Sequence, residues 1–170
     1  MNIKIKLIII AIIIGVVIVG YFLISLIPVI MISGVIGDAK SKNKIFSYVN
    51  ENYELLGKFP YTEIQKNNNK EEKEKFIKEH LGKNTIVQSV YAYNENILQY
   101  YCGGSGNVTG STYTGFYFSK NDTPYAMEFD GCDLNETKPG TFEWQNADGS
   151  HKIYTEKIRD NWYYYKLEWY

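Results

Sequence analysis

The pattern of apolar and polar positions divides the chain into a membrane segment and a globular domain. Residues 7–27 form a run of 21 without a charged side chain. A helix of that length is about 31 Å long, close to the roughly 30 Å hydrocarbon core of a bilayer. Apolar residues continue past Pro28, where a proline would end or kink the helix. The expected division is a short tail (1–6), a transmembrane helix with its apolar continuation (7–36), a juxtamembrane linker (37–44) and a globular domain (45–170).

The flanks of residues 7–27 indicate how the chain sits in a bilayer. The run is longer than the core of a secretory signal, and no Ala-x-Ala pattern follows it, so an uncleaved anchor fits better. Positive charges are nearly balanced, with Lys4 and Lys6 before the run and three lysines soon after it. The short tail and two cysteines placed to pair favour a single-pass protein of the cell membrane, with a cytoplasmic N-terminus and the domain outside.

The first part of the domain has helical periodicity. Four apolar residues recur at i, i+4, i+8 and i+11, namely Ile45, Val49, Tyr53 and Leu56. Gly57 should end this helix. The three asparagines at 67–69 offer an N-cap for a second helix over residues 70–81, and Gly82 suits the position after its C-terminus.

After Gly82 the apolar pattern changes to a period of two, which is typical of strands. The candidate strands are residues 85–93, 97–102, 113–119, 125–129, 141–145, 151–158 and 162–170. The short gaps between most of them contain turn residues and suit antiparallel hairpins. We therefore expect an α+β domain in which one or two helices pack on an antiparallel meander sheet of about 5–7 strands.

The domain is unusually rich in aromatic residues. They make up 16% of the chain, with 16 tyrosines and 3 tryptophans. In the last predicted strand, Trp162 and Tyr164 share a face with two charged residues, which would keep that face wet. Exposed aromatic rows stack on sugars or receive peptides, although such residues more often form stabilising cross-strand pairs. The candidate binding surface consists of Tyr101, Tyr113, Tyr117, Trp162 and Tyr164.

Cys102 and Cys132 are the only cysteines. In an oxidising compartment they would form one disulfide, which closes a loop of about 30 residues and stabilises by roughly 3–4 kcal/mol. The alternative is a thiol nucleophile, which needs a nearby base. His80 and His151 are the only histidines, and neither lies in a motif that links it to a cysteine. The same count is too small for a standard zinc site.

Two further loops lack recognisable chemistry. The run 102–106, Cys-Gly-Gly-Ser-Gly, has neither the Gly-Lys-Ser/Thr ending of a phosphate loop nor the spacing of a nucleophile elbow. We expect it to let the chain leave a strand at Cys102 and turn. Acidic residues between 128 and 136 lack the calcium-loop pattern. The sequence thus assigns no catalytic, cofactor-binding or metal-binding residue, and the formal net charge of −1 argues against nucleic-acid binding.

Three segments, residues 100–106, 113–118 and 160–165, resemble small uncharacterised membrane-anchored proteins of Gram-positive bacteria. The resemblance implies a bacterial cell surface and no particular activity. Together with the anchor and the aromatic content, it favours a non-enzymatic binding or interaction module whose partner is a protein, a peptide or an envelope polymer. Two alternatives remain: an accessory subunit of a membrane complex acting through its anchor helix, and a surface enzyme using Cys102 or the acidic loop.

Overall fold

The computed structural model describes residues 42–64, 66, 69–107, 110–129 and 131–170. The chain divides into two compact units, residues 1–41 and 42–170, and the second unit is the domain described here. The expected tail, the transmembrane helix with its continuation and most of the linker lie outside the described residues. Among the described helices, none has the length and apolar character needed to cross a membrane.

Helices form the first part of the domain. Residues 42–57 are helical, and α2 (Tyr61–Ile64) and α3 (Lys70–Leu81) follow. The structure confirms the predicted second helix at both ends, because the Asn69 side chain accepts a 2.9 Å hydrogen bond from the Glu71 amide and Gly82 follows the last turn. The short α2 has no apolar periodicity and was not predicted.

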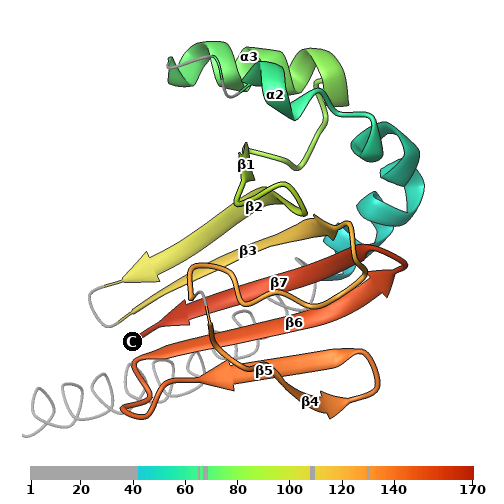
Figure 1. The fold of residues 1–170 in the computed structure, drawn as a ribbon. Coiled ribbons are helices and arrows are strands. Elements are labelled where there is room, and N and C mark those ends of the chain that lie inside the picture. The colour runs from blue at the N-terminus through green and yellow to red at the C-terminus, as the bar shows by residue number, and fades with distance from the viewer. Residues whose placement is uncertain (1–41, 65, 67–68, 108–109, 130) are drawn as a thin grey trace, which may run out of the picture. The chain divides into compact units, whose positions relative to one another are not determined.

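Seven antiparallel strands form one sheet, which confirms the α+β class. The strands are β1 (Ser89–Ala92), β2 (Ile97–Asn107), β3 (Gly110–Ser119), β4 (Asn135–Lys138), β5 (Thr141–Gln145), β6 (His151–Arg159) and β7 (Trp162–Trp169). Their order is β1-β2-β3-β7-β6-β5-β4. The sheet is therefore not one continuous meander. A connection over residues 120–134 carries the chain from β3 to the far edge, and β7 returns to pair with β3 (Figure 1).

The predicted strand over residues 125–129 is part of that connection and is not a strand. Ala126 and Met127 are buried because the connection lies across one face of the sheet, as Figure 1 shows in front of β6 and β7. The unpredicted β4 is an edge strand whose four residues are all exposed, so it has no apolar alternation to detect.

The β2–β3 hairpin is longer than predicted. The glycine-rich run does not leave the strand at Cys102 but continues β2 to Asn107, with a bulge between Tyr101 and Gly103. Gly104 is needed in this hairpin because a Cβ there would lie 2.6 Å from the Thr112 carbonyl oxygen. The glycines therefore allow close pairing of β2 with β3, and the prediction that they form a loop after Cys102 is wrong.

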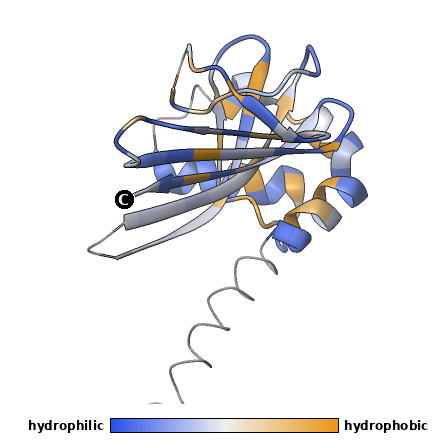
Figure 2. Cartoon of the chain, turned by 90° about the horizontal axis from the view of Figure 1, so that it is seen from below, coloured by the Kyte–Doolittle hydropathy of each residue, from blue (hydrophilic) through white to orange (hydrophobic). Residues whose placement is uncertain are grey.

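The sheet separates two hydrophobic clusters. Residues of β7 alternate between them, so the clusters lie on opposite faces. The helix-side cluster includes Val49, Leu56, Ile77, Tyr100, Phe116 and Trp162. The loop-side cluster includes Ile97, Tyr117, Met127, Ile153, Tyr163 and Tyr165. The helices carry both hydrophobic and hydrophilic stretches (Figure 2), as expected for helices that cover a sheet on one side only.

Two cation–aromatic contacts fasten helix 42–57 to β6. The Arg159 guanidinium lies 3.4 Å from the centroid of the Tyr53 ring. At the start of the helix, the Lys42 ammonium lies 5.2 Å from the centroid of the Tyr154 ring, and it also pairs with Glu156. Each such contact contributes about 0.5–2 kcal/mol. The helix that follows residues 1–41 is thus held firmly to the sheet.

Candidate functional site

The structure separates the five aromatic residues that the sequence proposes as a binding surface. Trp162 and Tyr164 are only 3% exposed and belong to the helix-side cluster. Tyr117 is fully buried in the loop-side cluster. These three are core residues that a ligand cannot contact. The prediction that they belong to a binding surface is therefore wrong. Tyr101 and Tyr113 remain partly exposed, and their ring centroids lie 6.3 Å apart on the loop side of the sheet.

These two residues belong to a cleft with a volume of about 350 Å³, which we call the tyrosine cleft. Five tyrosines line it, namely Tyr91, Tyr93, Tyr101, Tyr113 and Tyr165. The other lining residues are Gln99, Leu167 and Glu128. Its volume is at the small end of the range for ligand sites, about 300–1,000 Å³. Tyr91 is 53% exposed and Tyr93 36%, so aromatic rings form an accessible rim.

Tyr165, which lines the cleft, carries a hydroxyl group that the protein encloses. Tyr165 is fully buried, and its hydroxyl has no hydrogen-bond partner among the described residues. Burial raises the pKa of Tyr165 well above its usual value, and the Gln99 side chain beside the hydroxyl opposes this rise. An unsatisfied buried hydroxyl costs about 1–3 kcal/mol. The hydroxyl lies over Gly115, 2.7 Å from the position that a Cβ on this glycine would take, so it faces the sheet.

Glycines create the space that the cleft tyrosines occupy. Gly115 pairs with Tyr165 across β3 and β7, and a Cβ on Gly115 would lie 2.7 Å from the Tyr165 ring. A Cβ on Gly104 would lie 3.1 Å from the Tyr101 hydroxyl. Burial raises the pKa of Tyr101, and the neighbouring Tyr113 adds to the rise. The Tyr101 phenol, like any tyrosine at neutral pH, is protonated and can donate a hydrogen bond.

A series of neighbouring rings extends from the cleft across the sheet, and we call it the aromatic row. Its members come from β2, β3, β7, β6, the β3–β4 connection and β5, and the centroids of successive rings lie 5.1–6.3 Å apart. In that order they are Tyr101, Tyr113, Trp169, His151, Phe129 and Trp144. All six are at least partly exposed, and Trp169 is 38% exposed. Six rings in contact offer a long, partly apolar surface to a ligand.

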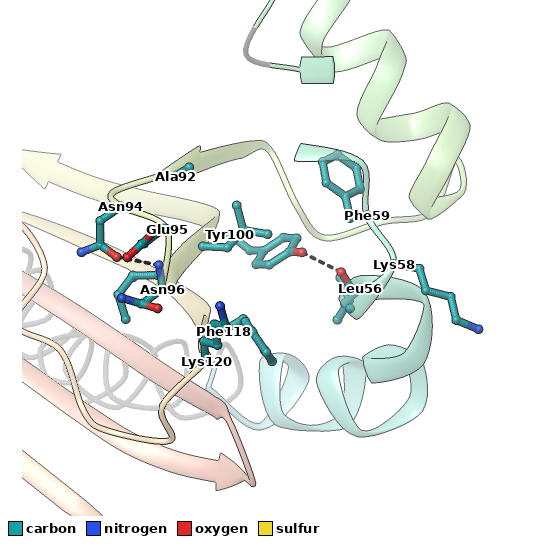
Figure 3. Close-up of a pocket in the computed structure, with 13 residues that line it drawn as sticks. Leu56, Lys58, Phe59, Ala92, Asn94, Glu95, Asn96, Tyr100, Phe118 and Lys120 are labelled. Carbon is teal, nitrogen blue, oxygen red and sulfur yellow. Dashed lines mark hydrogen bonds between the residues drawn. The ribbon is translucent and has the colours of Figure 1, made fainter. Parts of the chain in front are cut away.

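A second cavity, of about 200 Å³, lies between the end of helix 42–57 and the β1–β2 turn (Figure 3). Leu56, Phe118 and Tyr100 form its apolar wall. The Tyr100 hydroxyl points at the Leu56 carbonyl oxygen and donates to it at 2.8 Å, and the Asn96 amide donates to the Asn94 side chain at 2.9 Å. Because these polar groups already have partners, this cavity is a weaker candidate than the tyrosine cleft.

The two cysteines are free thiols in the structure. Cys102 packs against the helix-side cluster and Cys132 against the loop-side cluster, on opposite faces of the sheet. The disulfide expected from the sequence stays a prediction, and it would require one side chain to leave its cluster. Burial raises the pKa of the Cys102 thiol far above its usual value, which suppresses the reactive thiolate.

His151 lies in the aromatic row and away from Cys102. Its Nδ1 lies 2.7 Å from the Ser150 hydroxyl oxygen, and its ring contacts Phe129 and Trp169. Cys102 packs on the other face of the sheet. The structure therefore does not bring these two residues together as a nucleophile and base.

The sequence identified two of the eight cleft residues, Tyr101 and Tyr113. The sequence also contained a signal for three other cleft residues. Tyr91 and Tyr93 are two positions apart, so both lie on one face of the chain. Tyr165 lies on the face of β7 opposite the face that the sequence analysis proposed for binding. The sequence alone could not assign Glu128 to the cleft, because this residue belongs to the connection over residues 120–134. The chain matches no family model, and no curated protein or solved structure is significantly similar to it.

Proposed function

We propose that the domain is a non-enzymatic binding module that takes up an extended ligand along the aromatic row and into the tyrosine cleft. The single observation that carries this proposal is the accessible cleft lined by five tyrosines at one end of the aromatic row. Accessible aromatic side chains offer a large contact area to a ligand.

The domain binds its ligand on the outer side of a cell membrane. Residues 7–27 anchor the chain in that membrane, and the N-terminus lies in the cytoplasm. The uncharged length of this run supports the anchor. The partner is a component of the cell envelope, either a polymer or a protein segment. The aromatic row supports an extended partner, because its rings belong to strands from β2 to β5.

The binding proposal is tested with the full chain in lipid nanodiscs and purified cell walls of a Gram-positive bacterium. Co-sedimentation measures how much protein the walls retain. Trp169→Ala and Tyr113→Ala each remove one ring of the aromatic row and should weaken retention by at least about tenfold, as for central interface aromatics. Leu55→Ala is the matched control, because Leu55 is 44% exposed and lies on the helix 42–57.

Thermal unfolding checks that all three variants keep the fold. The proposal would be contradicted if Trp169→Ala and Tyr113→Ala both left retention unchanged. It would also be contradicted if Leu55→Ala reduced retention as much as they do. Replacing residues 7–27 with an unrelated hydrophobic helix should leave retention intact. If that exchange abolishes retention while the row variants do not, the chain acts through its anchor helix, as an accessory subunit would.

A further inference from the structure

The tyrosine cleft combines aromatic rings with one carboxylate, and this composition indicates the charge of its ligand, on the premise that the cleft is a binding site as proposed above. Four of its tyrosines are exposed or partly exposed, namely Tyr91, Tyr93, Tyr101 and Tyr113. Glu128 lines the same cleft and is also exposed. Glu128 forms no ion pair with another described residue. The cleft therefore offers a ligand the faces of several rings and one uncompensated negative charge.

The domain itself contains a filled site of the same composition. Three ring centroids lie 5.2–5.9 Å from Lys42 Nζ, those of Tyr154, Phe46 and Tyr164, and the same ammonium pairs with Glu156. The electron-rich faces of the rings attract a cation, and the carboxylate adds to this attraction. None of the eight described residues that line the tyrosine cleft is a lysine or an arginine. The cleft thus resembles the Lys42 site without its cation.

This charge favours a basic side chain over other ligands. An anionic group would be repelled by Glu128, and a neutral group would leave its charge unmatched. A lysine or arginine side chain carries its charge at the end of a flexible apolar stem. Such a stem can lie along the tyrosine rings while the backbone of the ligand stays outside the cleft. An amino sugar carries its amine directly on the ring, so the whole sugar would have to enter.

We propose that the tyrosine cleft binds a lysine or arginine side chain of a partner polypeptide, with the cation over the tyrosine rings and beside Glu128. The neighbouring residues of that polypeptide lie along the aromatic row, which begins at Tyr101 and Tyr113. Of the two kinds of envelope component considered above, the partner is therefore the protein segment.

The test uses ligand-observed NMR of the full chain in dodecyl maltoside micelles, whose headgroups are uncharged. The probes are four peptides, acetyl-Gly-Ser-X-Ser-Gly-amide, in which X is lysine, arginine, norleucine or citrulline. Norleucine and citrulline are the neutral counterparts of lysine and arginine. At least one of the two charged peptides should bind saturably, and its neutral counterpart should bind at least about fivefold more weakly, because it makes no cation–aromatic contact and no ion pair.

Substitutions at the rim test the ring and the carboxylate separately. Tyr91→Leu should weaken binding of the charged peptide by about threefold, because it removes a ring that is 53% exposed at the cleft. Tyr91→Phe keeps the ring and should bind like the wild type. Glu128→Gln should also weaken binding by about threefold. Its matched control is Glu95→Gln, at an exposed carboxylate of the β1–β2 turn, which should have no effect.

Salt dependence provides a readout that a merely structural role of Glu128 would not change. Raising sodium chloride from about 50 mM to about 500 mM should weaken binding to the wild type more than binding to Glu128→Gln, since salt screens the exposed ion pair. Thermal unfolding checks that all four variants keep the fold.

Several outcomes would overturn the inference. They are equal binding of the charged and neutral peptides, unchanged binding in Tyr91→Leu or in Glu128→Gln, and no binding of any peptide. Saturable, Glu128-dependent binding of glucosamine without binding of a peptide would also overturn it, in favour of an amine-bearing polymer. In each case, retention by cell walls that depends on the aromatic row would leave the proposed binding module standing. Retention that is independent of the row would remove the proposed function as well.

Discussion

The Tyr100 hydroxyl donates a 2.8 Å hydrogen bond to the carbonyl oxygen of Leu56, which lies 44 residues earlier in the chain. The acceptor is in the last turn of helix 42–57, where carbonyl groups lack helical partners. The donor is on β2, and its ring stacks on Phe116 with centroids 4.7 Å apart. One side chain thus satisfies a helix end and fixes the helix against the middle of the sheet.

Tyr100→Phe should lower the free energy of unfolding by about 1 kcal/mol. The loss is moderate because the Leu56 carbonyl oxygen still accepts from the Phe59 amide at 3.1 Å. Urea denaturation of the full chain, followed by tryptophan fluorescence, measures the change. Tyr53→Phe is the control, since its hydroxyl makes only an exposed 3.2 Å bond to Glu54. Equal effects in the two variants would contradict the assigned role of Tyr100.

Gly115→Ala should strongly destabilise the domain. An added Cβ would lie 2.2 Å from the Tyr100 carbonyl oxygen and 2.7 Å from the Tyr165 ring, in a central strand that cannot shift freely. We expect a loss of about 2–3 kcal/mol, as for severe overpacking. Gly57→Ala should be neutral or stabilising by up to about 1 kcal/mol, because nothing lies within 4 Å of its added Cβ. The same denaturation curves compare both variants.

The domain should lose stability in acid through Asp122. The Lys157 ammonium, 2.6 Å from Asp122 Oδ2, holds the pKa of Asp122 below its usual value, and the Asn161 amide and the Tyr163 hydroxyl add to this effect. A carboxylate with a lowered pKa in the folded state stabilises fully above its unfolded pKa of about 3.9. This stabilisation is lost as the pH falls through the lower folded value.

Asp122→Asn should therefore be less stable than the wild type at neutral pH, and this difference should shrink below about pH 4. Melting temperatures measured from pH 7 to pH 2 test the prediction. Glu95→Gln, at an exposed carboxylate of the β1–β2 turn, should leave the acid dependence unchanged. If the difference in melting temperature between wild type and Asp122→Asn stayed constant down to pH 2, protonation of Asp122 would not be linked to stability.

Thiol labelling tests both the proposed orientation and the pairing of the cysteines. In intact cells, a membrane-impermeant maleimide should label Cys132, which is partly exposed, without prior reduction. Cys102 should react far more slowly, because burial raises the pKa of its thiol. Labelling that requires an impermeant reductant would instead establish the disulfide predicted from the sequence. Labelling that requires broken cells would place the domain in the cytoplasm.

Local signals made some elements predictable. Helix α3 was predicted with its exact bounds, because an asparagine cap, a charged helical run and a following glycine all act within a few residues. Strands β5 and β6 were recognised for similar reasons, from their alternation and the turn between them. In each case the residues that determine the structure of the element lie within it or directly beside it.

The failures depend on contacts between distant segments. Residues 125–129 have the apolar content of a strand because the connection is itself buried against the sheet. Trp162 and Tyr164 share a face with charged residues, yet helix 42–57 covers them, and the Phe46 and Tyr164 rings lie 6.0 Å apart. Alternation shows which residues share a face, but only the tertiary fold determines what covers it. For this reason the sequence identified only two of the eight residues that line the cleft on the opposite face.

The central position of β7 has a consequence for biosynthesis. This strand lies between β3 and β6, and it alone joins the meander β1–β3 to the meander β4–β6. The ribosome makes residues 162–169 after every other strand. Until they emerge, each nascent chain carries two half-sheets with open edges and incomplete cores, and only the last strand converts them into a domain. Protection of these edges during synthesis is therefore a requirement that the topology itself imposes.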